Sequence, residues 1–249
     1  MYKYKYKLNN KYGDHYKKFL LDIKKHFYKS SNIMHKARNE LKILEYKNTQ
    51  MIAKSFKVPN RVNQLVYPMI RGSKAQKAYE YGIKLASFTP KPIGYIEFYD
   101  KKSLKESYFI SEQFHYDFTI REPLTDKNFK NRDEIFKAFA RFTLELHNNN
   151  IFHKDYSPGN ILIKEDGNSY IFKVVDINRM EFFKLNQEDR AKNFSKLWAD
   201  DDILDTIADE YAKYYSCDNK FKQQVLNFSN KNKKVKNFKK RLKGQKVND

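Results

Sequence analysis

The stretch that decides the fold is "HKDYSPGNILIKEDGNSYIFKVVDINRM", residues 153–180. It places Asp155 five residues before Asn160, and it places Asp176 at the end of the apolar run "IFKVV". Between them, the Asp-Gly pair at 166–167 predicts a β-hairpin. Two carboxylates and a carboxamide in this order suggest phosphoryl transfer, a reaction in which the protein mainly positions groups and neutralises charge.

Each of these side chains has a role in such chemistry. Asp155 is a carboxylate that can lie beside an acceptor hydroxyl, and Asn160 can return its oxygen to a metal if Pro158-Gly159 turns the chain back. Asp176 would supply a second oxygen ligand from the end of a strand. Oxygen ligands suit a hard cation such as Mg²⁺, and no Cys/His cluster in the sequence competes for a softer metal.

The chain around this stretch reads as strands first and mainly helices afterwards. Ser73 is the expected N-cap of the first helix, whose small and apolar residues recur at helical spacing. The expected elements are short strands within 32–58, a helix over 72–86, strands over 91–100 and 107–114, a helix over 133–148, the hairpin 161–175, and helices over 187–198 and 201–215. This order predicts an α+β chain with two lobes.

Four short motifs carry a resemblance to a known family. The set "HKDYSPGNIL", "DINRM", "ARNELKILE" and "AKSFKVPN" resembles the lipopolysaccharide kinase family, whose members have a protein-kinase-like fold and phosphorylate inner-core sugars, either Kdo or heptose. His153-Lys154-Asp155, four residues and Asn160 are similar to the kinase catalytic loop, and Asp176 is similar to the metal-binding Asp that follows it. The resemblance runs from about 32 to 215.

The resemblance implies a two-lobed α+β fold with a small antiparallel-sheet N-lobe, one key helix and a mainly helical C-lobe. On this basis the chain divides into a basic N-terminal extension (1–30), an N-lobe (31–112), a C-lobe (113–218) and a basic tail (219–249) that can form a helix. The implied cofactors are ATP and Mg²⁺. Asp155 would be the base that deprotonates the sugar hydroxyl, with Asn160 and Asp176 as the magnesium ligands.

The family also assigns roles in the N-lobe. Lys54, at the end of "MIAK", would hold the α- and β-phosphates of the nucleotide, and Glu80 in the following helix would hold Lys54 in place. Backbone groups near Glu112 and Phe114 would contact the adenine. His153 is expected to support the loop by hydrogen bonding.

The chain also departs from the protein-kinase pattern. No Gly-rich loop precedes Lys54, so backbone amides of the turn "HKARNE", helped by Arg38, would have to bind the phosphates. Lys154 replaces the usual arginine, Asn178 replaces the glycine after the metal-binding Asp, and no Ala-Pro-Glu marks a peptide-binding segment. These departures favour a sugar or other small-molecule acceptor. The alternatives are a protein kinase, a small-molecule phosphotransferase, or an inactive kinase-like binding module.

The net charge of +20 is concentrated at the two ends. Residues 1–30 and 219–249 carry net charges of +7 and +10, whereas 31–218 carries only +3. Such ends are either solubilising tails or contacts for an anionic partner, here a membrane surface near a lipid A-linked saccharide acceptor. A balanced middle makes nucleic acid a disfavoured partner, and the sequence indicates no obligate protein partner.

The tail contains a helical stripe of apolar residues among lysines, at 221, 225, 228, 235, 238 and 242. This stripe would either dock on the large lobe or lie on an anionic bilayer. Cys217 is the only cysteine, and neither a signal region nor an apolar stretch of roughly 18–20 residues is present. We therefore expect a cytoplasmic protein, with peripheral binding at the inner face of the inner membrane as the alternative.

Overall fold

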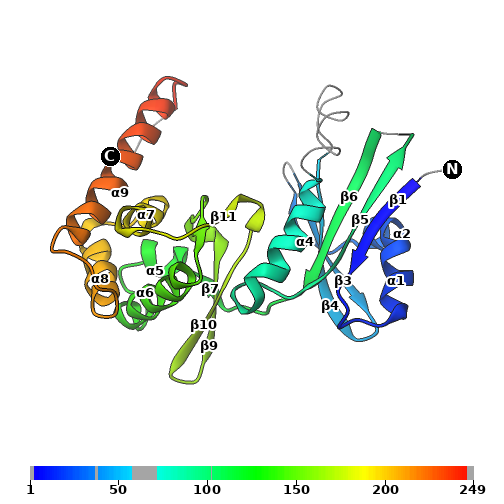
Figure 1. Ribbon diagram of the computed structural model, residues 1–249, viewed down its shortest axis with the longest axis horizontal. Coiled ribbons are helices and arrows are strands. Elements are labelled where there is room, and N and C mark those ends of the chain that lie inside the picture. The colour runs from blue at the N-terminus through cyan, green and yellow to red at the C-terminus, as the bar shows by residue number, and fades with distance from the viewer. Residues whose placement is uncertain (1–2, 37–38, 58–71, 102, 246–249) are drawn as a thin grey trace. The chain divides into compact units, whose positions relative to one another are not determined.

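The computed structural model describes residues 3–36, 39–57, 72–101 and 103–245. It divides the chain into two compact units, Met1–Phe114 and His115–Asp249. The first unit is built on an antiparallel sheet and the second is mainly helical (Figure 1), which confirms the predicted α+β class.

Six antiparallel strands form the sheet of the first unit, in the order β1-β5-β6-β4-β3-β2. The strands are β1 (Lys3–Leu8), β2 (Ile33–Lys36), β3 (Glu40–Tyr46), β4 (Thr49–Ser55), β5 (Pro92–Asp100) and β6 (Ser103–Glu112). Between β3 and β4, Lys47 and Asn48 both have left-handed backbone angles, with φ of 49° and 61°. Positive φ at both central residues is the geometry of the tight turn that matches the twist of a hairpin.

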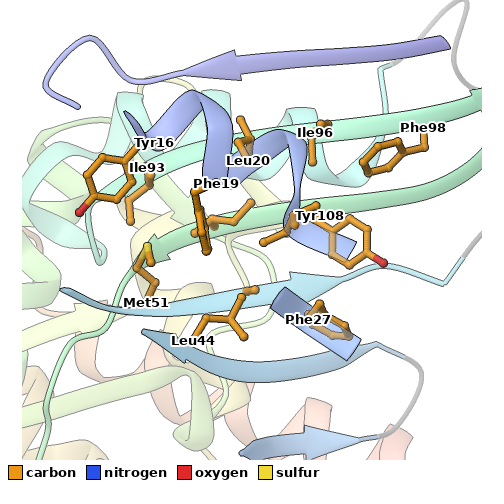
Figure 2. Close-up of a cluster of buried hydrophobic side chains, with 13 residues drawn as sticks. Tyr16, Phe19, Leu20, Phe27, Leu44, Met51, Ile93, Ile96, Phe98 and Tyr108 are labelled. Carbon is orange, nitrogen blue, oxygen red and sulfur yellow. The ribbon is translucent and has the colours of Figure 1, made fainter. Parts of the chain in front are cut away.

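Helices cover both faces of this sheet. On one face, α1 (Asp14–Leu21) and α2 (Ile23–Lys29) pack against a large apolar cluster (Figure 2). Its buried members are Tyr16, Phe19, Leu20, Ile23, Phe27, Leu44, Met51, Ala53, Ile93, Ile96, Phe98, Tyr108 and Ile110. On the other face lies α4 (Lys74–Leu85), which shares a smaller cluster with Phe56, directly after β4, and with residues of β5 and β6.

The segment 1–30 is part of the sheet unit, which corrects its prediction as a separate extension. Strand β1 pairs with β5 in unbroken register from Lys3↔Tyr99 to Leu8↔Gly94. The two chains approach so closely that a Cβ at Gly94 would lie 2.7 Å from the carbonyl oxygen of Lys7, so this position requires glycine. The alternation of tyrosine and lysine fits an edge strand as well as a tail, and the structure shows the edge strand, where lysines protect the open edge of the sheet.

Helix α4 confirms the predicted helix over 72–86. The hydroxyl of Ser73 accepts a hydrogen bond from the backbone N–H of Gln76 at 3.1 Å, so Ser73 is the N-cap as expected. Ala75, Ala78 and Tyr79 are buried, and they fix the helix on the sheet.

The second unit contains most of the helices together with two small sheets. Its helices are α5 (Arg121–Thr125), α6 (Arg132–Asn148), α7 (Gln187–Asn193), α8 (Asp201–Ala212) and α9 (Phe221–Arg241). Its strands are β7 (Phe118–Thr119), β8 (Ile151–His153), β9 (Ile161–Asp166), β10 (Ser169–Val174) and β11 (Met180–Phe182). Two 3₁₀ turns matter below: η2 (Pro158–Asn160) and η3 (Ile177–Arg179).

The predicted hairpin is present in the second unit. Strands β9 and β10 pair from Ile161↔Val174 to Asp166↔Ser169, and Gly167 takes the positive φ of 60° in the turn. Strand β9 also pairs with β7, and β8 pairs with β11. These pairings bring both ends of the stretch 153–180 back to the same place.

The tail is a helix that docks along its first half. Phe221 and Val225 of α9 are buried, and Phe221 stacks on Tyr211 of α8 at a centroid distance of 5.2 Å. Further along the same helix the apolar residues Val235, Phe238 and Leu242 are 46%, 62% and 72% exposed. The sequence left two alternatives for the tail, docking on the large lobe or lying exposed for a bilayer. In the structure the first half of α9 is docked and the apolar residues of its second half are exposed. No helix within the described ranges is both long and apolar enough to cross a membrane.

Candidate functional site

The loop after β8 is held by His153. Nδ1 of His153 accepts a hydrogen bond from the backbone N–H of Asp155 at 3.1 Å, and Nε2 is 3.0 Å from the carbonyl oxygen of Val175. Since Nδ1 accepts, we assign the proton to Nε2, which then donates to Val175. Burial lowers the pKa of His153, which keeps the ring neutral. His153 thus joins the Asp155 loop to the segment that ends at Asp176.

Asn160 closes the same loop from its other end. Its side-chain Nδ2 donates to the carbonyl oxygen of Asp155 at 2.9 Å and lies 3.1 Å from the hydroxyl oxygen of Ser157. The backbone turns through η2, which begins at Pro158, so the Pro-Gly pair returns the chain as predicted. The side-chain nitrogen of Asn160 is thus engaged within the loop.

Asn160 and Asp176 meet at the open end of the hairpin. The ladder that pairs Ile161 with Val174 continues one step further, since the N–H of Val175 donates to the carbonyl oxygen of Asn160 at 2.9 Å. Asp176 comes next and has left-handed angles, φ 54° and ψ 44°, which turn the chain from β10 into η3. Aspartate tolerates this region better than most residues do. The sheet register thus brings the backbones of the two expected metal ligands close to each other.

The donor set fits a magnesium ion that keeps part of its shell for other ligands. Asn160 and Asp176 offer oxygen atoms, and the side-chain oxygen of Asn178 is buried with no hydrogen-bond partner among the described residues. No group of three or more His, Cys, Asp or Glu side chains in the described ranges could hold a metal. A site with few protein oxygens is typical of Mg²⁺ that is also bound by substrate phosphates and water.

Arg179 is a member of this site that the sequence prediction missed. Its Nη1 lies 3.2 Å from Oδ2 of Asp155, in an ion pair whose members are both partly exposed. Its carbonyl oxygen accepts a hydrogen bond from the N–H of Lys154 at 3.0 Å. Arg179 belongs to the motif "DINRM", but nothing in the sequence shows that β11 pairs with β8 and so brings it to Asp155.

A buried chain of hydrogen bonds supports the loop from beneath. The relay runs from the Arg190 guanidinium to the Tyr211 hydroxyl (2.9 Å), from that hydroxyl to His147 Nδ1 (2.9 Å), and from His147 Nε2 to Asn193 Oδ1 (3.0 Å). Asn193 Nδ2 then donates to the carbonyl oxygen of His153 at 2.9 Å. If His147 is neutral, every donor in this chain of hydrogen bonds faces an acceptor. Burial lowers the pKa of His147 to about 3, which agrees with a neutral ring.

Tyr156 fixes the middle of the loop against α6. Its ring stacks on Phe139 at a centroid distance of 5.6 Å, and its hydroxyl lies 2.9 Å from the Thr143 hydroxyl. Tyr156 is fully buried. The residue next to Asp155 is therefore anchored, which limits the freedom of the Asp155 backbone.

This chain shares its fold with a protein of known structure. No protein-family model matches the chain. No curated protein matches it in sequence either. Among solved structures, WaaP in complex with acyl carrier protein matches with a TM-score of 0.56 and 12% identity, over 93% of this chain and 99% of that chain. The chain has a kinase-like fold. At 12% identity the similarity concerns the fold, and the roles of individual residues stay predictions.

In a kinase-like fold the sheet unit is the part expected to bind the nucleotide. Lys54 lies on β4 opposite Phe109 of β6, two residues before Phe56, and its Nζ is 5.4 Å from the Phe56 ring centroid. Phe56 and Phe109 belong to the cluster under α4, so Lys54 is on the face of the sheet that α4 covers. Glu80 is on that helix, exposed, and accepts a hydrogen bond from Gln76 at 2.8 Å. The pairing of Lys54 with Glu80 stays a prediction.

The end of β6 is the expected adenine site. The N–H of Glu112 donates to the carbonyl oxygen of Lys91 at 2.8 Å, and the Glu112 carboxylate accepts from the Tyr12 hydroxyl at 2.7 Å. The Glu112 N–H is therefore engaged within the sheet, and contact of adenine with backbone groups near Glu112 and Phe114 stays a prediction. Arg38 lies outside the described residues.

Proposed function

We propose that this protein is a Mg²⁺-dependent kinase that transfers the γ-phosphate of ATP to a sugar hydroxyl of the lipopolysaccharide inner core, on Kdo or heptose. One observation carries the proposal: a single hydrogen-bonded loop and hairpin hold Asp155, Asn160 and Asp176 together in a kinase-like fold. WaaP shares this fold with the chain. The resemblance of the motifs to the lipopolysaccharide kinase family supports the acceptor.

In this mechanism Asp155 is the base. Its carboxylate would orient the acceptor hydroxyl and take its proton as the phosphoryl group is transferred. The ion pair with Arg179 keeps a counter-charge at 3.2 Å from the carboxylate before the acceptor binds. An arginine in this position could also stabilise the charge of the phosphoryl group in transfer. His153 and Tyr156 would hold the loop so that the carboxylate is positioned before the substrate arrives.

The remaining residues would bind the nucleotide. Asn160 and Asp176 would hold Mg²⁺, which neutralises charge on the β- and γ-phosphates. Lys54 would contact the α- and β-phosphates, with Glu80 orienting it.

A lipid-linked acceptor is reached at a membrane surface, and α9 offers a way to bind one. The exposed face of α9 carries Val235, Phe238 and Leu242, and the exposed lysines Lys231 and Lys234 lie beside it. Apolar side chains among lysines are typical of a helix that lies on an anionic bilayer. We propose that this half of α9 keeps the enzyme at the inner face of the membrane.

The test is phosphate transfer by the purified full chain. Radiolabelled ATP with Mg²⁺ is offered together with Kdo-containing lipid A, and separately with a heptose-extended acceptor. Label is expected in the lipid fraction, and it is expected to be absent when Mg²⁺ is chelated or when Asp155→Asn replaces the wild type. Label transferred only to a peptide mixture or to a soluble small molecule would replace the lipopolysaccharide acceptor with one of the alternatives. Absence of ATP turnover with every acceptor would contradict the kinase proposal itself.

A further inference from the structure

Arg121 lies against the loop that carries Asp155 and Asn160. It is the first residue of α5, two positions after the end of β7. A Cβ added to Gly159 in this loop would lie 2.6 Å from Nη2 of Arg121 and 3.4 Å from its Cζ. The guanidinium therefore occupies the space that any larger residue at position 159 would need.

The backbone of Gly159 does not itself require glycine. Gly159 is part of the 3₁₀ turn η2 and does not have a positive φ, unlike Gly167 in the hairpin turn. An alanine can adopt such a backbone conformation without strain. What glycine provides at this position is room for Arg121 to approach the loop.

The sheet of the second unit fixes the backbone from which the Arg121 side chain extends. The N–H of Ile120 donates to the carbonyl oxygen of Ile161 at 3.0 Å, and both isoleucines are fully buried. Ile161 directly follows Asn160, one of the expected metal ligands. The backbone of Arg121 is therefore held beside the end of the loop at which the magnesium ion would bind.

Within the part of the chain that the structure describes, the exposed guanidinium of Arg121 has neither a hydrogen bond nor an ion pair. Glu122, its acidic neighbour, instead accepts hydrogen bonds from the N–H and the hydroxyl of Thr119, at 2.9 and 2.6 Å. An arginine whose backbone is fixed and whose N–H donors are unused by the protein is well suited to bind an anion. By contrast, four other arginines of this unit use their side chains within the protein: Arg132, Arg141, Arg179 and Arg190.

The two ends of the loop 155–160 each have an arginine. Arg179 pairs with Asp155 at 3.2 Å, at the expected base, where the acceptor hydroxyl would lie. Arg121 lies at Gly159, next to Asn160 and the expected metal. In phosphoryl transfer the magnesium ion is also bound by the nucleotide phosphates, so a cation beside a metal ligand is on the nucleotide side of the reaction.

We propose that Arg121 binds a phosphate group of the nucleotide, and that Gly159 is the residue that gives it access. This inference rests on the proposed function, in which Asn160 holds the magnesium ion of Mg²⁺–ATP. A guanidinium presents paired N–H donors that match two oxygens of one phosphate. The ligand class is a nucleoside di- or triphosphate, and binding of a nucleoside without phosphates is independent of Arg121.

The contact can be measured without an acceptor. ATP, ADP and adenosine are titrated into the full chain in the presence of Mg²⁺, and their binding is followed by calorimetry. Arg121→Gln should weaken the binding of ATP about ten- to hundred-fold, the usual effect of losing one charged contact, and leave that of adenosine unchanged. Arg121→Lys keeps the charge without the paired donors, and it should recover part of the affinity.

Lys164→Gln is the matched control. Lys164 is an exposed residue of β9 in the same unit, so its loss changes the net charge equally, and it should leave every affinity unchanged. The melting temperature of Arg121→Gln should also stay close to that of the wild type, because the exposed guanidinium has no bond to the described part of the chain.

Gly159→Ala tests the same contact from the loop. The methyl group takes the space of the guanidinium, and this flexible, exposed side chain can move away at little cost in stability. Gly159→Ala should therefore reproduce the selective loss of ATP affinity. It should add little further loss in a chain that already carries Arg121→Gln, since both changes remove one contact. Fully additive losses would overturn the role of Gly159.

Three results with Arg121→Gln would overturn the phosphate contact: an unchanged ATP affinity, an equal loss for adenosine, or a loss that Lys164→Gln reproduces. A higher KM for the acceptor at unchanged ATP affinity would assign Arg121 to the acceptor and overturn it too. The kinase and the contact also fail separately. If ATP binds through Arg121 but no acceptor is phosphorylated, the contact stands and the proposed kinase activity falls. If phosphate is transferred and Arg121→Gln binds ATP as the wild type does, the kinase stands and the contact falls.

Discussion

Asp155 is the side chain on which the proposed chemistry depends most. Asp155→Asn keeps the size of the residue, its backbone contacts with His153 and Asn160, and hence the loop. It removes the proton acceptor, so phosphate transfer should fall about 10²–10⁴-fold. The affinity for Mg²⁺–ATP and the melting temperature should stay close to those of the wild type. Transfer by the variant at the wild-type rate would show that another group is the base.

A substitution at Asp176 tests whether this residue binds the magnesium ion. Asp176→Ala removes the only charged side chain of the expected ligand pair, so productive binding of Mg²⁺–ATP should be lost. The measurement is nucleotide affinity as a function of magnesium concentration, with Asp166→Ala in the exposed hairpin turn as the control. A magnesium dependence equal to that of the wild type would place the metal elsewhere.

Lys54 and Glu80 are predicted to act as a pair, and the loss of Lys54 should lower activity more than the loss of Glu80. Lys54→Met removes a cation from the phosphates and should lower kcat about 10²–10³-fold, the usual effect of losing one preorganised charged contact. Glu80→Gln should lower activity less, because the glutamate only orients the lysine. Steady-state kinetics of both variants and their double mutant would check this. A larger effect at Glu80 than at Lys54 would contradict the pairing.

The residues of the candidate site differ in how far the sequence could reveal them. Asp155, Asn160 and Asp176 stand close in the chain with characteristic spacing, so they were predicted before the fold was known. Arg179 has no such signal, because the pairing of β11 with β8 decides its position. Local spacing shows residues that act from one loop, whereas residues supplied by tertiary contacts have to be seen in the structure.

Among the elements, α6 and α8 support the site through the relay that contains His147. The folded state keeps His147 neutral with a pKa of about 3, whereas in the unfolded chain the pKa is about 6.5. Between about pH 3 and pH 6.5, His147 therefore binds a proton in the unfolded state and not in the folded state. The contribution of neutral His147 to the free energy of unfolding is fully present above about pH 6.5. As the pH falls below about 6.5, the free energy of unfolding should decrease by about 1.4 kcal/mol per pH unit for this one group.

Denaturant unfolding at pH 7 and pH 5 measures that dependence. His153 is also buried with a lowered pKa, and it adds to the loss in the same direction. His147→Gln should be less stable than the wild type at pH 7, since it disrupts the relay, and it should show a shallower loss of stability on acidification. An identical pH dependence in the wild type and the variant would mean that His147 is not the titrating group.

Among helices and strands, those with regularly spaced apolar residues or a clear turn motif could be predicted from the sequence. The elements of the segment 1–30 could not. The α4 helix has a capping serine and apolar residues at helical spacing, and the β9–β10 hairpin has an Asp-Gly turn. In the segment 1–30, by contrast, the alternation of tyrosine and lysine in β1 fits either an edge strand or a tail, so the sequence alone does not place it in the sheet. Its place in the sheet depends on Gly94, a residue far along the chain that allows β1 to approach β5.

At the scale of the whole molecule, the charge at the C-terminal end is combined with an exposed apolar face on one helix. The first half of α9 is part of the fold, because Phe221 and Val225 are 1% and 0% exposed. Deleting residues 219–249 should therefore destabilise the protein and cannot test membrane binding by itself. The three exposed residues of the second half can be changed without opening the core.

The final prediction concerns the variant Val235→Ser, Phe238→Ser, Leu242→Ser. Its melting temperature should stay close to that of the wild type, since these side chains are 46%, 62% and 72% exposed. Its binding to vesicles that contain phosphatidylglycerol should be weaker, because the lysines alone contribute only about 1 kcal/mol each, and this contribution decreases with salt. The variant should also have a higher KM for a lipid-embedded acceptor and an unchanged KM for a soluble fragment of it. Phosphatidylcholine vesicles serve as the control, to which neither protein should bind. Equal binding of both proteins to the anionic vesicles would show that the apolar face has no part in membrane attachment.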